Sequence, residues 1–260
     1  MELFTENAAV PPENRRIARN GRVIDADVYR PAARRGPVAV FSHGFGGGKG
    51  DFAGSAAFLA RHGVGAVTFT FCGSGPHDGN GFPTDKMTLL TETEDLLAVA
   101  DFAQREAWSD GRLLLVGGSM GGMVSALAAQ SGADAAGMAL LYPAFCIPDD
   151  WNARWPDDAA IPETFGLWGV TLGRAFVRAL RGLDVYEKMA QFSGHVCLFH
   201  GAKDGVVPLS YSERAAEAYP DSELIVFPEE GHGFSPQAMQ DVNRRLLERI
   251  RSGLFFPSKK

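Results

Sequence analysis

Long hydrophobic runs and clusters of basic residues are both missing from this 260-residue chain. No apolar run approaches the roughly 18 residues that a membrane-spanning helix needs. Basic residues gather only in pairs, as at Arg34-Arg35 and Lys259-Lys260, and the formal net charge is -6. An acidic chain without a basic patch repels nucleic-acid phosphates and anionic lipids. The sequence therefore predicts a protein that binds neither nucleic acid nor membrane.

Cysteine is scarce as well, and the start of the chain carries no secretion signal. Cys72, Cys146 and Cys197 are odd in number, widely spaced and without a Cys-x-x-Cys pair. This pattern is typical of buried, reduced thiols and argues against disulfides or a zinc site. Residues Met1 to Asn7 lack the basic and apolar segments of a signal peptide. We therefore expect a cytoplasmic protein that holds no metal and no cofactor.

Short apolar segments alternate with longer helical patterns along most of the chain. Asn20-Gly21 predicts a hairpin between the first two segments, because both turn residues tolerate positive φ. Strands are expected at 15–18, 23–29, 38–42, 66–71, 113–117, 138–142, 196–200 and 224–227, and helices at 52–62, 87–105, 120–130, 210–218 and 236–251. Because most of the strands are apolar throughout, they favour a doubly wound, mostly parallel eight-stranded α/β sheet with helices on both faces.

One long stretch, residues 143–181, interrupts this alternation. No strand is expected in it, and it is too long for an ordinary connection, so it predicts a small helical cap or lid inserted into the fold. Residues 1–142 and 182–260 are then expected to form a single core domain. The stretch is rich in aromatic side chains, which either line a pocket for an acyl group or only hold the cap on the core; they are Trp151, Trp155, Phe165, Trp168 and Phe176.

The chain contains 31 glycines, and several of them surround one serine in the pattern Gly-x-Ser-x-Gly. Ser119 follows the predicted strand 113–117 and directly precedes a predicted helix, which is the context that a nucleophile elbow requires. Glycines on either side of Ser119 remove side chains that would clash in so sharp a turn. The alternative is a glycine-rich turn with an incidental serine.

An acid and a histidine follow Ser119 in the order that this architecture uses. Asp204 comes after the strand 196–200, and His232 comes after the strand 224–227. His232 would take the proton of Ser119, and Asp204 would orient the imidazole. Each of the two, taken alone, is also compatible with an ordinary turn residue, but the three placements agree with one another.

A second glycine-rich loop, His43 to Gly48, follows the strand 38–42. It predicts an oxyanion hole, in which the backbone N–H groups of Phe45 and Met120 would face the carbonyl oxygen of a substrate. His43 is expected to support this loop by hydrogen bonds rather than to act as a base. A flexible glycine turn is the alternative.

These motifs resemble the α/β-hydrolase superfamily from Arg15 to Arg251, and most closely the bacterial intracellular cinnamoyl and feruloyl esterases. The resemblance rests on His43-Gly44-Phe45, on Gly73-Ser74-Gly75, on the elbow around Ser119 and on the inserted cap. It implies a triad of Ser119, Asp204 and His232, with Phe45 and Met120 as oxyanion donors.

The resemblance also implies contacts to substrate in the cap. Asp150 falls where the family holds the phenolic hydroxyl of a hydroxycinnamoyl group, with Asp149 as the alternative. Near Phe176 the family often has a tyrosine, and its elbow usually reads Gly-His-Ser-Gln-Gly, whereas this chain has Gly118 and Met120 beside the serine. Asp150, Trp151, Trp168 and Phe176 are therefore the candidate substrate-binding residues.

Together the motifs predict a serine hydrolase that cleaves carboxylic esters through an acyl-enzyme. Hydroxycinnamoyl esters and other aryl or short-acyl esters are the candidate small-molecule substrates. A peptidase, a thioesterase or a lactonase would use the same residues, and a small-molecule binding module that has lost catalysis is the non-enzymatic alternative. Whether the chain forms a homodimer is left open.

Overall fold

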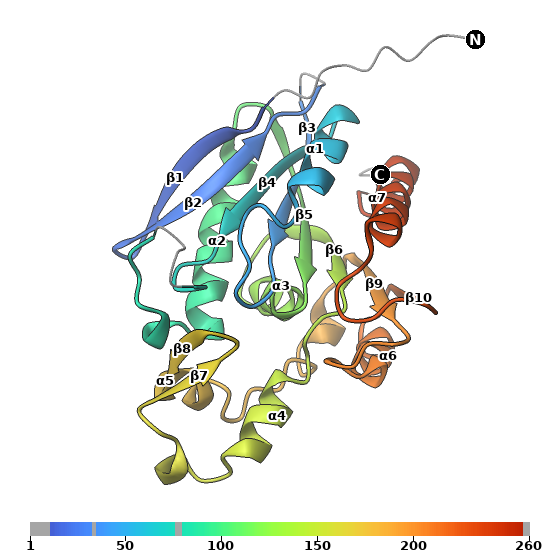
Figure 1. The fold of residues 1–260 in the computed structure, drawn as a ribbon. Helices are drawn as coiled ribbons and strands as arrows, with labels where there is room; N and C mark the ends of the chain where they lie inside the picture. The colour runs from blue at the N-terminus through green and yellow to red at the C-terminus, as the bar shows by residue number, and fades with distance from the viewer. Residues whose placement is uncertain (1–10, 33–34, 76–79, 257–260) are drawn as a thin grey trace, which may run out of the picture.

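A sheet of eight strands forms the centre of the protein in the computed structural model (Figure 1). Its strands lie in the order β1-β2-β4-β3-β5-β6-β9-β10. β1 and β2 are antiparallel to their neighbours, and the other six run parallel to one another. This arrangement confirms the predicted fold class. The bounds are β1 Glu13–Arg19, β2 Arg22–Tyr29, β3 Gly36–Ser42, β4 Gly65–Thr70, β5 Ser109–Gly118, β6 Ala135–Leu141, β9 His195–Gly201 and β10 Ser222–Phe227.

The structure describes residues 11–32, 35–75 and 80–256. The predictions of location and charge rest in part on residues outside the described ranges. These are Met1 to Asn7, Arg34 and Lys259-Lys260. None of the helices formed by the described residues combines the length and the hydropathy that a membrane span requires.

Helices cover both faces of the sheet, because successive side chains of its buried strands point to opposite sides. Leu113 and Leu115 of β5 pack in one core with α2, α3 and α6, whereas Leu114 and Val116 pack in a second core with α1 and α7. The helices match the predicted ones within two residues at each end: α1 Ala53–Arg61, α2 Leu89–Arg105, α3 Met120–Gln130, α6 Leu209–Ala218 and α7 Pro236–Ser252.

The predicted hairpin joins β1 and β2. Arg19 pairs with Arg22, and the two residues between them, Asn20 and Gly21, have φ angles of 47° and 76°. Two positive φ values are what a type I′ turn requires. The Asn-Gly signal is thus confirmed.

The segment between β6 and β9 contains strands as well as helices, which corrects the expectation that residues 143–181 hold no strand. A short antiparallel hairpin, β7 to β8, lies among short helices at the end of the molecule beyond the sheet (Figure 1). Its strands have only four residues each, and its turn begins with tryptophan rather than with a typical turn residue. The bounds are α4 Ile147–Arg154, η2 Asp158–Ala160, β7 Thr164–Leu167, β8 Val170–Gly173, α5 Arg174–Arg178 and η3 Met189–Gln191.

This hairpin is tied to the core by a hydrogen bond. The Thr84 hydroxyl in the short helix η1 (Thr84–Lys86) donates to the carbonyl oxygen of Thr171 over 2.6 Å. A Cβ on Gly173 would lie 2.1 Å from the carbonyl oxygen of Asp85, so the end of β8 packs directly on the backbone of η1. The hairpin is therefore fixed against η1.

Candidate active site

Ser119 stands in a strained turn between β5 and α3. Its φ is 54° and its ψ is -122°, a conformation that costs energy for any residue with a Cβ. Hydrogen bonds hold the turn on both sides: the Ser119 N–H donates to the Leu141 carbonyl (2.9 Å), and the Ala144 N–H donates to the Ser119 carbonyl (2.9 Å). The strain therefore persists because neighbouring backbone fixes the serine in place.

Close backbone packing explains two of the glycines around this turn. A Cβ on Gly121 would lie 2.3 Å from the carbonyl oxygen of Ser42, so only glycine lets α3 approach β3 so closely. A Cβ on Gly44 would lie 3.2 Å from the Cβ of Ser119. The loop after β3 therefore runs directly against the serine.

Three side chains from separate loops meet in a hydrogen-bonded line. His232 Nε2 lies 2.8 Å from Ser119 Oγ, and His232 Nδ1 lies 2.9 Å from Asp204 Oδ2. The Asp204 side chain is fully buried, and that of His232 is 20% exposed. The other carboxylate oxygen of Asp204 accepts the N–H groups of Val206 and Val207, each over 2.8 Å. The structure thus brings together the serine, acid and histidine that the sequence nominates.

A second histidine, His200, lies beneath the acid and was not singled out in the sequence. Its Nε2 lies 3.0 Å from the Val207 carbonyl oxygen and 3.3 Å from Asp204 Oδ2, and its Nδ1 lies 2.7 Å from Ser212 Oγ. Burial lowers the pKa of this imidazole. A neutral ring therefore donates from Nε2 and accepts the Ser212 hydroxyl at Nδ1, which steadies the Asp204 loop. In the sequence, the position of His200 at the end of a strand and four residues before the acid was the signal that could have identified it.

The two predicted oxyanion donors lie beside Ser119. Met120 is the first residue of α3, so its N–H has no acceptor inside the helix and lies at the positive end of the helix dipole. Phe45 directly follows Gly44, whose backbone packs against Ser119. His43 supports this loop, as the sequence predicts: its Nε2 accepts the Phe71 N–H (3.0 Å) and its Nδ1 donates to the Gly44 carbonyl (2.7 Å). Burial lowers the pKa of His43.

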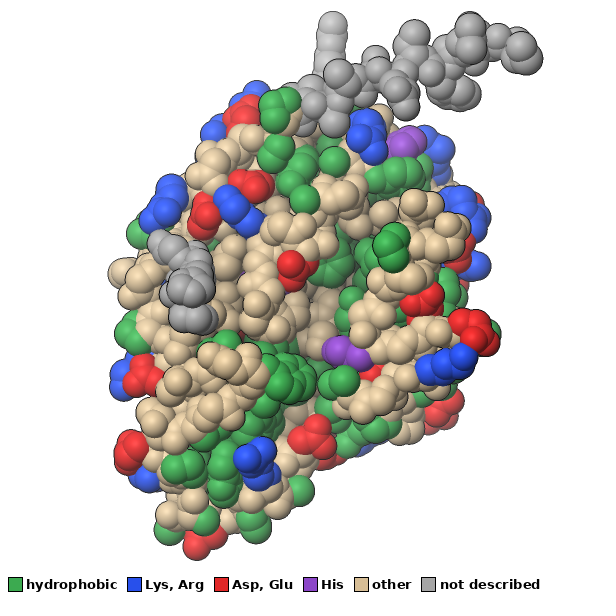
Figure 2. All heavy atoms as spheres, in the orientation of Figure 1, with side chains coloured by type: hydrophobic (Ala, Val, Ile, Leu, Met, Phe, Trp, Pro, Cys, Tyr) green, Lys and Arg blue, Asp and Glu red, His purple; other side chains and the backbone are tan. Residues whose placement is uncertain are grey.

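Two cavities open on either side of Ser119, and Phe45 and Trp168 line both. Figure 2 shows a hollow in the middle of this face, with a histidine at its edge and hydrophobic side chains around it. We call the cavity of about 350 Å³ that His232 lines the histidine-side cavity. The other, of about 300 Å³ and lined by residues of α4, is the cap-side cavity.

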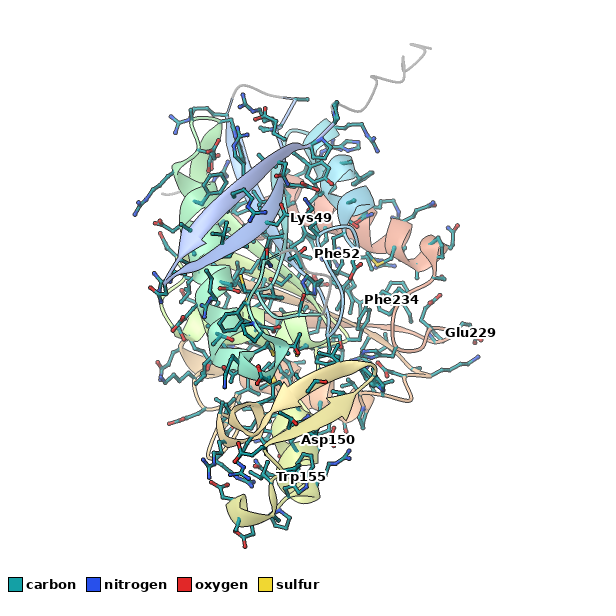
Figure 3. The ribbon with its side chains drawn as sticks, turned by 60° about the vertical axis from the view of Figure 1, so that its left-hand side comes forward. Lys49, Phe52, Asp150, Trp155, Glu229 and Phe234 are labelled. Atoms are coloured by element: carbon teal, nitrogen blue, oxygen red, sulfur yellow. The ribbon has the colours of Figure 1, made fainter. Side chains whose placement is uncertain are left out.

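The four candidate substrate contacts all line the cap-side cavity; they are Asp150, Trp151, Trp168 and Phe176. Asp149 does not line it, because its carboxylate accepts a hydrogen bond from the Tyr211 hydroxyl over 2.9 Å. Trp155 and Phe165 do not line it either: their rings pack against Trp151, with centroids 5.5 and 5.1 Å from its ring. In Figure 3, Asp150 and Trp155 lie in the inserted segment, away from Phe52 and Phe234.

Backbone strain is concentrated at these cavities. Among the described residues, four that are not glycine have a positive φ. Asn20 is in the hairpin turn, but Ser119, Tyr142 and Trp168 all line the cavities. Such strain clusters at functional sites. Tyr142, with a φ of 38°, was missed in the sequence, where its place just after β6 was the only signal.

A separate group of metal-ligating side chains lies at the other end of β9 and β10. His195, Cys197 and Glu223 each offer one atom, and these atoms lie within 4.8 Å of one another. The Arg249 guanidinium, however, binds both oxygens of Glu223 and holds the pKa of that carboxyl at about 2. The guanidinium of Arg249 therefore already supplies a positive charge to this group. Its pairing with Glu223 joins α7 to β10.

Residues 34–179, more than half of the chain, match the family of serine aminopeptidases, S33. The chain belongs to this family. The protein is thus a hydrolase of the α/β-hydrolase superfamily, as the motifs around Ser119 predict.

Known proteins resemble this hydrolase at low identity. A proposed carbamate hydrolase, RutD, from Caulobacter sp. (strain K31) is 32% identical over 109 residues, and the match spans only 40% of each chain. Est1E from Butyrivibrio proteoclasticus, solved with ferulic acid bound, is 22% identical with a TM-score of 0.82 over 91% of this chain and 99% of that one. Acetyl xylan esterase 1 from Thermoanaerobacterium sp. JW/SL YS485 is 18% identical with a TM-score of 0.69 over 95% and 86%. At such identities the two structures establish the fold alone.

Proposed function

We propose that this hydrolase cleaves carboxylic esters through an acyl-enzyme, with Ser119 as nucleophile, His232 as base and acid, and Asp204 as the orienting carboxylate. The observation that carries the proposal is the hydrogen-bonded line from Ser119 Oγ through both nitrogens of His232 to Asp204. Asp204 accepts the Nδ1–H, which leaves the lone pair of Nε2 free to take the serine proton.

The reaction follows from this arrangement. Ser119 Oγ attacks the ester carbonyl and passes its proton to His232 Nε2. The negative charge that develops on the carbonyl oxygen is held by the N–H groups of Phe45 and Met120, with the dipole of α3 behind the latter. His232 then protonates the departing alcohol. Water, activated by the same nitrogen, hydrolyses the acyl-enzyme.

The cap-side cavity is the proposed site of the acyl group. Its walls are mostly apolar and aromatic, including Trp151, Trp168 and Phe176, which suits an aryl or short-acyl chain. Asp150 is the acid on this wall and can accept a hydrogen bond from a phenolic hydroxyl. Hydroxycinnamoyl esters are therefore candidate substrates, and the likeness in fold to Est1E, which binds ferulic acid, is compatible with them.

Replacement of Ser119 tests the proposal. Ser119→Ala should reduce kcat on an aryl acetate by about 10⁶ and abolish labelling by a fluorophosphonate probe, read by intact mass. Ser131→Ala, at the exposed opposite end of α3, is the matched control and should retain both. If Ser119→Ala keeps a tenth of the activity, Ser119 is not the nucleophile. If the parent protein takes no label, the non-catalytic binding module becomes the better description.

A substrate panel decides the bond that is cleaved. Ester, thioester and amide substrates with the same acyl group, together with a lactone and an aryl carbamate, would separate an esterase from a thioesterase, peptidase or lactonase. Carbamate is included because of the partial likeness to RutD. We expect the highest kcat/KM for the ester, and a higher value for any other bond would overturn the ester assignment.

A further inference from the structure

The histidine-side cavity combines aromatic rings with a single charged carboxylate. The described residues that line it include no lysine and no arginine. The rings come from four separate parts of the chain and meet edge to face, with centroids 4.9 Å apart for Tyr142 and Phe234 and 5.9 Å apart for Phe45 and Trp168. Figure 3 labels two of the ring-bearing residues, Phe52 and Phe234. The carboxylate and the five rings belong to Asp51 and to Phe45, Phe52, Tyr142, Trp168 and Phe234.

Among the described residues, no cation pairs with the carboxylate of Asp51. Asp51 is exposed, accepts the Gly48 N–H at Oδ2 over 3.2 Å, and forms no salt bridge with any described residue. The lysine two positions before it, Lys49, is bound instead to Asp25 and Asp27, over 3.0 and 2.8 Å. The carboxylate therefore leaves a net negative charge at the wall of the cavity.

Tyr142 lines the same cavity as Asp51 and is affected by its charge. Burial, followed by the charges of Asp51 and Asp204, raises the pKa of its phenol to about 12. A negative potential that opposes ionisation of a phenol favours any cation brought to the same place. An aromatic ring also attracts a cation electrostatically where the cation lies over the ring, and five aromatic residues line this cavity.

The position of His232 decides which part of an ester lies here. His232 lines this cavity and not the cap-side cavity. Under the proposed function, on which this step rests, His232 hands its proton to the leaving alcohol, so the alcohol must lie within its reach. The histidine-side cavity is therefore the leaving-group side, and the cap-side cavity receives the acyl group.

We propose that the histidine-side cavity selects leaving groups that carry a positive charge, as in esters of alkylammonium alcohols. Aromatic rings with a nearby carboxylate are the arrangement that recognises quaternary ammonium groups, which cannot use ordinary hydrogen bonds. The cap-side cavity has no such bias, because it is lined by one acid, Asp150, and one base, Arg154. The charge preference therefore belongs to the alcohol and not to the acyl group.

Two acetate esters of equal size test this proposal. O-acetylcholine, the acetate ester of choline, and 3,3-dimethylbutyl acetate differ only in a charged nitrogen in place of a carbon. The parent enzyme should favour the choline ester about tenfold in kcat/KM, equivalent to about 1.4 kcal/mol. Asp51→Asn, which keeps an oxygen for the Gly48 N–H, should bring that ratio close to one. Asp134→Asn, the same charge change at an exposed site before β6, should leave the ratio as it is.

The outcomes separate this inference from the proposed function. If both esters are cleaved without preference, or if Asp51→Asn keeps the preference, the cation site is wrong while the esterase assignment stands. If neither ester is cleaved, calorimetry on Ser119→Ala with choline and with 3,3-dimethylbutanol decides instead. Tighter binding of choline, lost in Ser119→Ala/Asp51→Asn, supports the cation site without ester cleavage. Equal or absent binding of the two alcohols overturns it.

Discussion

Replacing Asp204 by asparagine should inactivate the hydrolase while leaving its fold intact. One carboxylate oxygen of Asp204 accepts two N–H groups, from Val206 and Val207, each over 2.8 Å. An asparagine must keep its oxygen there, because its NH₂ group would face two donors. The NH₂ then points at His232 Nδ1, which lies 2.9 Å from the other oxygen in the parent. His232 Nδ1 must accept, so its proton moves to Nε2.

That change of tautomer removes the base. With a proton on Nε2, His232 can only donate to Ser119 Oγ, 2.8 Å away, and cannot take the serine proton. A wrong tautomer in a triad of this kind costs about 10⁴ in kcat, which is about 5.4 kcal/mol of transition-state stabilisation. The hydrogen bonds to Val206 and Val207 survive, so the free energy of unfolding should fall by no more than about 1–2 kcal/mol.

The assay is steady-state hydrolysis of an aryl acetate, with urea unfolding measured on the same samples. Asp134→Asn makes the same chemical change at an exposed site and serves as the control. If Asp204→Asn folds normally and kcat falls less than about tenfold, the carboxylate does not set the tautomer of His232. Another acid would then have to do so.

Three further variants probe other parts of the structure. Gly121→Ala should lower the free energy of unfolding by about 1–3 kcal/mol and kcat by about 100-fold, because its Cβ would lie 2.3 Å from a backbone oxygen. Gly54→Ala, where space is open, is the control, and equal stability of the two variants in urea would contradict this prediction. Burial, then Asp95, raises the pKa of Glu92, so the folded state loses stability as pH rises through that pKa. Glu92→Gln should therefore gain stability relative to the parent as pH rises above 4.5, the ordinary pKa of a glutamate, and a difference independent of pH would exclude this explanation. Asparagine tolerates a positive φ, such as the 46° of residue 168, so Trp168→Asn should keep the stability of the parent. The KM for aryl esters should rise about tenfold, and an unchanged KM would mean that the ring does not touch substrate.

Local elements of this fold follow from the sequence because their signals lie within a few residues. The helix predicted at 120–130 is α3, with the same bounds, and Asn20-Gly21 forms the predicted turn. The hairpin of β7 and β8 has no comparable signal. Trp168, a residue that seldom adopts positive φ, begins its turn, and the hairpin is held by contacts such as that between Thr84 and Thr171. Tertiary packing there outweighs local preference.

The candidate site divides in the same way. Sequence patterns nominate Ser119, Asp204 and His232, because a nucleophile elbow and two loops after strands are each visible locally. Their meeting depends on the register of the parallel strands, which aligns loop ends across 113 residues of chain. The same holds for Asp149 and Asp150: neighbours on a helix point about 100° apart, so only the position of α4 decides that Asp150 lines the cavity.

The charge of the protein also divides between what its sequence determines and what its fold determines. The lack of basic clusters and the net charge of -6 predict a protein that binds neither nucleic acid nor membrane, and this prediction depends on charge alone. The structure adds where the unbalanced charge lies: Asp51, unremarkable in the chain, stands among aromatic rings that come together only in the folded protein. Composition sets the sign of the charge. Folding determines which surface carries it, because distant segments must pack before a cavity and its field exist.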